Sequence, residues 1–252
     1  FGYGSAMKEN LAGIEDYTRI GSLLQPEQIV KYGELTLREN QIAYAEPSFF
    51  RLFDFELLKG DKKTCLSMPG QVVITERIAS KYFKDEDPIG KIFIFTGAYD
   101  KISCEVTGVM KEMPSNSHIH YSFLISYKSL PKYMQEYWYK HEAYTYVLLD
   151  SPERKAEIER EFPVMAEKYK TDEALKNKTW GVSLIPLADI HLTPQVGYEA
   201  ETKGNRSSMI ALIFAAIAIL AIAWINYINL TVARSMERAK EVGVRRVVGA
   251  FR

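Results

Sequence analysis

An unbroken run of uncharged residues at 209–233 sets the first limit on how this chain folds. The run reads MIALIFAAIAILAIAWINYINLTVA and is 25 residues long. A bilayer core about 30 Å thick requires about 20 such residues in a helix. The alternative is a buried core helix, but such helices are usually shorter and have a polar edge. The sequence therefore predicts one membrane-spanning helix over residues 209–233.

Charged residues are distributed unevenly on the two sides of this run. The whole chain is neutral, with 32 basic and 32 acidic residues. From residue 234 onward six basic and two acidic residues give a net charge of +4, which leaves −4 for the rest of the chain. Because basic residues flanking a span are retained in the cytoplasm, we expect residues 234–252 inside the cell and residues 1–208 outside.

An outer domain of this size requires a signal peptide or an earlier span for its export. The first residues, FGYGSAMKEN, contain no initiator Met, no basic region and no apolar region of a signal peptide. At the other end the helical pattern reaches Arg252 without a capping residue. We therefore expect the natural protein to continue beyond both ends of this sequence.

Residues 1–208 have the composition and periodicity of a folded α+β domain. The chain is 47% hydrophobic and 25% charged, which is ordinary globular usage. Apolar residues alternate with polar ones in several β-rich runs, most clearly around Cys104 and Val106. The strand candidates are YTRIGSLL at 17–24, QIVKYG at 28–33, ELTLRE at 34–39, QVVI at 71–74, ISCEVTG at 102–108, AYTYVLL at 143–149 and WGVSLIPL at 180–187.

Two helices are predicted from capping residues as well as from period. Thr75 precedes ERIASKYF at 76–83, and KDEDPIG at 84–90 supplies the stop. Ser151 and Pro152 suit the N-cap and first position of a second helix, in which Pro163 predicts a kink or a division into two shorter helices. The apolar face of that helix contains Ile158, Phe162, Met165 and Tyr169.

The order of these elements predicts mixed short strands and helices in two subdomains, with a junction within residues 95–125. The polar stretch GYEAETKGN at 197–205 is interpreted as a tether to the membrane. The expected domains are therefore 1–208 outside, 209–233 in the membrane and 234–252 as the start of a cytoplasmic segment.

No residue pattern in the sequence supports catalysis. The phosphate-binding string GxxxxGK followed by Ser or Thr does not occur. His118 and His120 in SNSHIHY would share one face of a strand, as two metal ligands do, but a third ligand is not evident and a metal is not expected. The carboxylates at 84–90 are interpreted as a solvated turn. We expect neither an enzyme nor a cofactor.

The two cysteines, Cys65 and Cys104, have no metal-ligand spacing. They allow either one disulfide or two buried thiols.

The segment after the predicted span has the pattern of an amphipathic helix. Val244, Val247, Val248 and Phe251 fall at helical spacing, and charged residues occupy other faces. A basic anchor on anionic lipid is one interpretation. The interspersed glutamates, with Gly243 and Gly249, favour docking to a cytoplasmic partner. Within the span, Asn226 and Asn229 share a face, which favours packing against other membrane helices.

Several strings in this order resemble the FtsX-like permeases of ABC transporters, with an outer region similar to the MacB-type periplasmic core domain of Bacteroidetes-type bacteria. The resemblance runs over nearly the whole chain. It rests on YAEPSFFRLFDFELLKGD, VVITERIASKYFKDEDPIGKIF, VTGVMKEMPSNSHIHYSFLIS, PLADIHL and, after the span, ERAKEVGVRRVVGA.

This resemblance implies a permease with four spans whose large outer domain lies between the first and second. The chain would then hold that domain in the periplasm and the second span in the inner membrane. Its partners would be a separate cytoplasmic ABC ATPase, a second permease copy, membrane lipid and a periplasmic protein, but not nucleic acid. The ATPase would drive export or mechanotransmission through a coupling segment containing Arg238, Glu241, Gly243, Arg245 and Gly249.

A function from another class fits the single span as well. A sensor or adhesion module would bind a ligand with its outer domain and signal through its tail. Further hydrophobic segments beyond Arg252 would favour the permease, whereas a kinase-like domain there would favour the sensor.

Overall fold

A computed structural model of the chain describes residues 2–21, 27–97, 101–136, 138, 143–170, 176–192 and 206–249. The chain divides into two compact units, Phe1–Leu184 and Ile185–Arg252. We call the first the sheet domain and the second the helical unit. The predicted tether at 197–205 lies outside the described residues.

The sheet domain mixes helices and strands along its length, which confirms the α+β prediction. Its helices are α1 (Tyr3–Asn10), α2 (Phe49–Leu52), α3 (Glu76–Phe83), the 3-10 helix η1 (Tyr127–Ser129), α4 (Lys132–Gln135) and α5 (Arg154–Glu167). Its strands are β1 (Ile14–Gly21), β2 (Glu27–Tyr32), β3 (Leu35–Asn40), β4 (Ile42–Ala45), β5 (Leu57–Lys59), β6 (Gln71–Thr75), β7 (Ile92–Thr96), β8 (Lys101–Met110), β9 (Phe123–Ser126) and β10 (Tyr144–Leu149). The helical unit contains the 3-10 helix η3 (Leu187–Leu192) and α6 (Arg206–Val247).

All the described strands belong to one mixed sheet. Their order is β10-β1-β4-β9-β6-β8-β7-β2-β3, with β5 paired to β8. The pairs β4–β9 and β6–β8 are parallel, and the other pairs are antiparallel. The prediction of two subdomains meeting within residues 95–125 is wrong. That stretch supplies β8 and β9, whose apolar side chains continue the core of the sheet instead of dividing it.

Two hydrophobic cores lie on opposite faces of this sheet. In β6, Val72 and Ile74 face the first core, whereas Val73 faces the second. Successive side chains of a strand point to opposite faces, which explains this division. The apolar face of α3 packs on the first core, and α2 packs on the second through Phe49 and Phe50. Tyr127 of η1 and Met134 of α4 also contribute to the first core.

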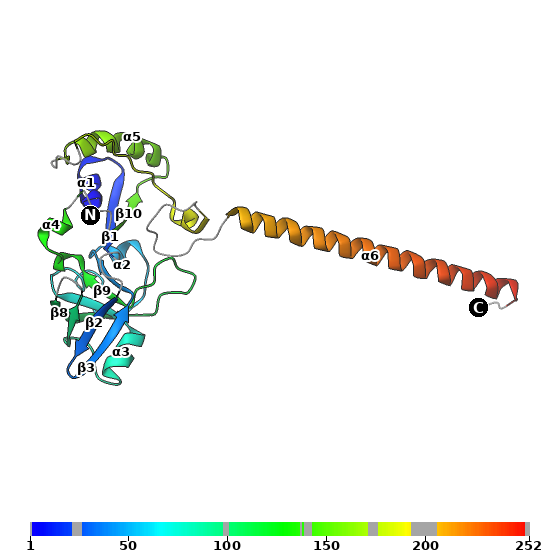
Figure 1. The fold of residues 1–252 in the computed structure, drawn as a ribbon, viewed down its shortest axis with the longest axis horizontal. Coiled ribbons are helices and arrows are strands. Elements are labelled where there is room, and N and C mark those ends of the chain that lie inside the picture. The colour runs from blue at the N-terminus through cyan, green and yellow to red at the C-terminus, as the bar shows by residue number, and fades with distance from the viewer. Residues whose placement is uncertain are drawn as a thin grey trace. The chain divides into compact units, whose positions relative to one another are not determined.

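A third core packs α1 and α5 against β1 and β10. The two helices lie together at one end of the sheet domain, away from α3 (Figure 1). Trp138 is buried in this core, and its ring centroid lies 4.8 Å from that of Tyr3 in α1. Trp180, from the segment after α5, packs against the same core. The first helix of the domain and its last segment thus share one set of apolar contacts.

Every strand candidate except 180–187 corresponds to a strand, although residues 22–24 of the first candidate lie outside the described residues. The alternation at 102–108 is confirmed in β8. Cys104 and Val106 are buried there, while Ser103 and Glu105 are exposed. The segment 180–187 forms no strand in the described structure. Trp180, Val182 and Leu184 instead alternate onto the third core through their side chains. In this segment the hydrophobic alternation therefore reflects side-chain packing on the core and not hydrogen bonding to a neighbouring strand.

The helix predicted at 76–83 is confirmed as α3. The Thr75 hydroxyl oxygen accepts the backbone N–H of Ile78 at 3.4 Å, which is the expected N-cap contact. Lys84 then ends the helix with a φ of +55°. The turn at 84–90 is largely exposed, and its Asp87 and Glu86 pair with Lys59 and Lys91 at 3.0 and 2.9 Å. These pairs are those of a solvated turn, as predicted.

The start of α5 differs from the prediction. The helix begins at Arg154 with Glu153 as its N-cap, and no side chain caps it. The carbonyl of Ser151 accepts the N–H of Arg154 at 3.3 Å, so Ser151 and Pro152 form a turn before the helix. Pairing between Arg154 and Glu157 at 2.5 Å supports the first turn in place of a hydroxyl cap.

The division of this helix at Pro163 is also wrong. α5 continues as one helix from Arg154 to Glu167 with the proline inside it. Proline removes one backbone donor and crowds the preceding turn, which destabilises a helix interior. Phe162 and Met165, on either side of the proline, are both buried in the third core. Tertiary packing of these side chains therefore offsets the destabilisation of the helix by Pro163.

Both cysteines are buried free thiols. Cys104 packs in the first core and Cys65 in the second, on opposite faces of the sheet. A disulfide requires the two Cβ atoms to face one another at short range, so this arrangement decides between the two alternatives. Burial raises the pKa of Cys65 to about 11 and that of Cys104 to about 12.

We expect neither thiol of the folded chain to react with an aromatic disulfide reagent at pH 8. The thiolate is the reactive form, and a raised pKa leaves about one thousandth of Cys65 as thiolate at that pH. Unfolding in urea should make both thiols react. The measurement is the number of thiols titrated before and after unfolding. Rapid reaction of either thiol in the folded protein would contradict its burial.

Candidate functional site

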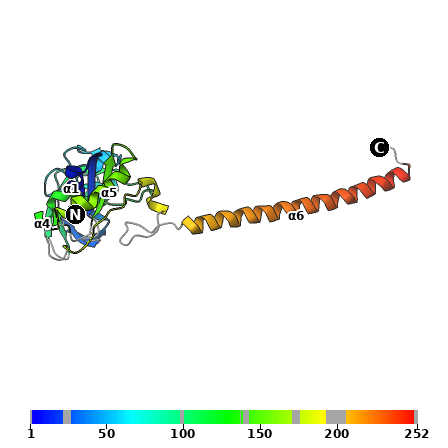
Figure 2. The ribbon, with the colours of Figure 1, turned by 90° about the horizontal axis from the view of Figure 1, so that it is seen from above.

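Among the described residues, α6 is the one helix that is long and apolar enough to cross a membrane, judged by its length and composition. It contains all of the predicted span at 209–233. Figures 1 and 2 show it as a single unbroken helix from Arg206 to Val247. The predicted span and the charged segment that follows it are therefore parts of one helix.

The apolar part of α6 has two different faces. At 100° per residue, Ala211, Ala215 and Ala218 lie on the same side as Asn226 and Asn229, with Ile222 and Ile225 between the alanines and the asparagines. The opposite side contains large residues, namely Ile213, Ile217, Leu220, Trp224 and Tyr227. Small residues let helix backbones approach closely, and amides form hydrogen bonds between membrane helices. The side with the two asparagines thus has the chemistry of a helix-packing face.

The amphipathic helix predicted after the span is present as the last part of α6, up to Val247. Arg238, Glu241 and Arg245 follow one another at i, i+3 and i+7, so they share a face of the helix. A guanidinium nitrogen of Arg245 lies 2.5 Å from a carboxylate oxygen of Glu241. Val244 occupies another face, and Phe251 lies outside the described residues. This end of α6 presents an exposed charged face.

The two glycines of the predicted coupling segment have different roles in the backbone. Gly243 lies inside the helix, and a Cβ placed on it would meet no atom within 4 Å. Gly249 has a φ of +80°, the left-handed conformation that glycine adopts after a helix C-terminus. The expectation of a helix that reaches Arg252 without a cap is therefore wrong. The sequence predicts Gly249 as part of a docking segment, whereas the structure places it at the end of the helix.

The two histidines do not lie on a strand, so the geometry in which they would share one face is not present. His118 and His120 belong to the connection between β8 and β9. A ring nitrogen of His118 lies 3.0 Å from the hydroxyl oxygen of Tyr146, which anchors this connection to β10. In the described part of the chain, no group of three or more side chains could hold a metal ion.

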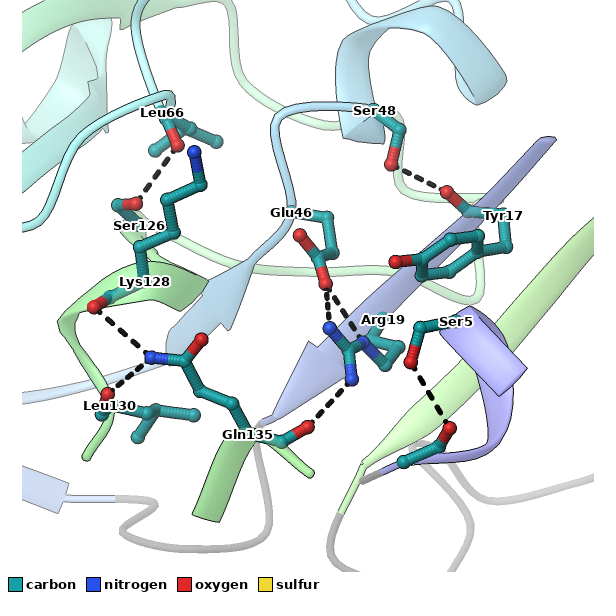
Figure 3. A network of polar contacts seen from close by, with 11 residues as sticks. Ser5, Tyr17, Arg19, Glu46, Ser48, Leu66, Ser126, Lys128, Leu130 and Gln135 are labelled. Carbon is teal, nitrogen blue, oxygen red and sulfur yellow. Dashed lines mark hydrogen bonds and ion pairs between the residues drawn. The ribbon is translucent and has the colours of Figure 1, made fainter. Parts of the chain in front are cut away.

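A buried ion pair joins distant parts of the sheet domain. Arg19 of β1 and Glu46, which follows β4, are 6% and 8% exposed. Arg19 donates from Nε to Glu46 at 2.8 Å and from Nη1 to the Gln135 carbonyl oxygen at 2.8 Å (Figure 3). Its guanidinium carbon lies 4.3 Å from the ring centroid of Tyr127. Four segments separated in sequence are thus connected through one guanidinium.

Sequence reasoning did not anticipate this network. Arg19 alternates with Ile20 in β1, and that pattern places an arginine on the solvent side of a half-buried strand. No local signal indicates that Glu46 and Gln135 would cover it. Burial also raises the pKa of Tyr127, whose ring packs against the guanidinium.

Residues 3–163 match the family described as MacB-like periplasmic core domain. A comparison with curated proteins gave no match. Among solved structures, a crystal structure of a domain of a protein assigned as a permease from Porphyromonas gingivalis is similar. It is 23% identical, with a TM-score of 0.59, over 69% of this chain and 73% of that chain. The similarity shows a shared fold.

Two further crystal structures are similar at lower scores. The periplasmic region of MacB from Actinobacillus actinomycetemcomitans is 15% identical, with a TM-score of 0.47, over 66% of this chain and 72% of that chain. The extracellular domain of the noncanonic ABC-type transporter YknZ from Gram-positive bacteria is 16% identical, with a TM-score of 0.48, over 69% and 87%. Because the family match covers more than half of the sequence, the chain belongs to the MacB-like periplasmic core domain family, in an ABC permease-like protein.

Proposed function

We propose that the chain is part of a permease subunit that couples ATP hydrolysis in the cytoplasm to motion of a periplasmic domain. In this proposal residues 1–208 lie in the periplasm, residues 209–233 cross the inner membrane and residues 234–252 begin a cytoplasmic segment. ATP hydrolysis belongs to a separate ABC ATPase, and this chain has no catalytic role. The motion would serve export or mechanotransmission.

The observation that carries this proposal is the continuity of α6. The helix has 42 residues, which corresponds to about 63 Å at a rise of 1.5 Å per residue. The hydrocarbon core is about 30 Å thick. One helix is therefore long enough to reach from the charged segment across the whole bilayer. A displacement applied to Arg245 is carried along the helix axis because no loop interrupts it.

The charged face of α6 supports docking to the ATPase. Arg238, Glu241 and Arg245 present charges of both signs, which favours a protein surface over anionic lipid alone. Gly243 lies on the opposite side of the helix from this face, and a Cβ there would meet no atom within 4 Å. An alanine there would favour the isolated helix by about 1 kcal/mol, so a glycine at this position is consistent with close approach by a partner on that second side.

The membrane part of α6 supports packing against other helices. Asn226 and Asn229 have no water in the hydrocarbon core to hydrogen-bond with, so a neighbouring helix is their favourable environment. The alanines on the same side permit a short distance between helix axes. We propose that this side faces other spans of the permease, including those of a second copy.

We expect Arg245→Glu to reduce the amount of ATPase that purifies with the full-length protein by about tenfold, the effect of about 1.4 kcal/mol. The change breaks the pair with Glu241 and places two like charges four residues apart. Arg246→Glu is the matched control, since it makes the same change in net charge on an adjacent face. Its effect should be less than about twofold.

The measurement is quantitative mass spectrometry of the protein purified from its native membrane. Equal losses for Arg245→Glu and Arg246→Glu would assign the effect to lipid attraction and remove the docking role of this face. If no ATPase accompanies the wild-type protein and a kinase does, the sensor alternative replaces the permease.

A further inference from the structure

The segment that leads from α5 towards α6 is attached to the sheet domain by side chains. Residues 176–186 form no strand in the described structure. Trp180, Val182 and Leu184 pack against the third core. The backbone N–H of Leu184 donates to a carboxylate oxygen of Glu159 in α5 at 2.7 Å. Tension on this segment therefore acts first on a small set of side-chain contacts, before it reaches any strand of the sheet.

Trp138 is the centre of these contacts. Its ring stacks on that of Tyr169, with centroids 4.4 Å apart and planes 9° apart. It also stacks on Trp180, at 5.4 Å and 5°. Offset parallel stacking of large rings is favourable beyond the area it buries. Trp180 belongs to residues 176–186, which we call the connecting segment. Its stacking on Trp138 therefore fixes the connecting segment to the sheet domain.

The first helix of the chain enters the same cluster. The Tyr3 ring meets Trp138 edge-on at 4.8 Å and Trp180 edge-on at 6.3 Å. The Tyr3 hydroxyl donates to the Trp138 carbonyl oxygen at 3.0 Å. A Cβ on Gly2 would overlap the Trp138 indole, so the backbone itself lies against this ring. Both ends of the sheet domain are thus held by one indole.

We propose that Tyr3, Trp138, Tyr169 and Trp180 form an aromatic clasp through which displacement of α6 enters the sheet domain. This inference rests on the proposed function, because it names the contacts that receive the motion. The clasp couples both ends of the sheet domain to α5. The ten-stranded sheet then moves as one rigid unit. When the clasp is released, motion of α6 extends the connecting segment and the domain stays where it is.

The attachment is tested by hydrogen exchange on the full chain in detergent. Trp180→Ala should speed exchange of the Leu184 amide by tenfold or more, because this N–H donates to Glu159 and loses that bond when the segment detaches. Amides of β6 and β8 should be unchanged, which shows that the domain is folded. Tyr133→Ala is the matched control, since Tyr133 is 71% exposed. If exchange of the Leu184 amide is unchanged in Trp180→Ala, the clasp does not hold the segment and the inference is wrong.

A tension measurement tests transmission directly. Handles are placed at Lys84, which is exposed, and at the C-terminus of the full chain. The wild-type chain should show a separate rupture step before the sheet unfolds, and Trp180→Ala should lack it. Glu159→Leu, which removes the acceptor for the Leu184 N–H, should lower the force of this step. A wild-type trace without the step, or an unchanged trace for Trp180→Ala, would overturn the inference. Neither arm uses an ATPase, so a failed clasp and a failed permease assignment give different results.

Discussion

Replacing Arg19 by Met is expected to lower the free energy of unfolding of the sheet domain by about 3–5 kcal/mol. The substitution removes the guanidinium and leaves the carboxylate of Glu46, 8% exposed, without its positive partner. An uncompensated buried charge costs more than the intact pair contributes. The Gln135 carbonyl also loses its donor at 2.8 Å. The measurement is urea unfolding of the full chain in mild detergent, followed by near-ultraviolet circular dichroism.

Two further variants separate the charge from the packing. In Arg19→Met with Glu46→Leu both charges are absent, and most of the lost stability should return. Arg51→Met removes a surface arginine that lies 2.5 Å from Asp16 and whose side chain is 65% exposed. Arg51→Met should lower the free energy of unfolding by no more than about 1 kcal/mol. If Arg19→Met and Arg51→Met cost the same, burial of the Arg19 pair has no special effect on stability.

Placing an arginine at Leu220 should abolish stable insertion of the chain in the membrane. Leu220 is near the middle of residues 209–233 and is 63% exposed on α6. A charged residue at the centre of a spanning helix costs about 3 kcal/mol relative to leucine. That cost shifts the insertion equilibrium by about a hundredfold. The measurement is the fraction of chain that resists alkaline extraction from membranes.

Met236→Arg is the control for this substitution. Met236 is 69% exposed on the same helix, three residues beyond the predicted span. An arginine there adds the same charge on the cytoplasmic flank, where basic residues are favoured. Insertion should be unchanged. Equal resistance to extraction for Leu220→Arg and the wild type would show that α6 does not cross the bilayer, and the proposed topology of residues 1–208 would fail with it.

The elements that the sequence predicts well are those whose local signals agree with their environment. In α3, the Thr75 cap and the apolar face are both set by residues close together in the sequence, and the structure confirms both. β8 is half-buried, so its alternation is visible in the sequence. By contrast, all four residues of β4 and all four of β9 are buried, which erases the period of two. Short strands with both faces covered carry no such pattern.

The errors in the sequence analysis occur where tertiary contacts outweigh local preference. Pro163 argues against a continuous helix, but burial of its neighbours in the third core keeps α5 intact. The alternation of Trp180, Val182 and Leu184 reports packing against the third core rather than strand pairing. The same limit applies to the site. The span and the charged face of α6 depend on composition and period along one helix, whereas the partners of Arg19 come from distant segments and could not be predicted.

The register of β1 has a consequence for how this domain is made. Ile14 of β1 pairs with Leu149 of β10, and Ile20 pairs with Tyr144. β1 is synthesised first, but its outer edge is covered only after β10 has been synthesised and has paired with it. Pairing of segments so far apart along the chain is slow, and an uncovered strand edge invites association with other chains. If the domain is exported as proposed, its folding is completed only after β10 has left the translocation channel. Until then β1 is the part of the nascent domain most exposed to misassembly.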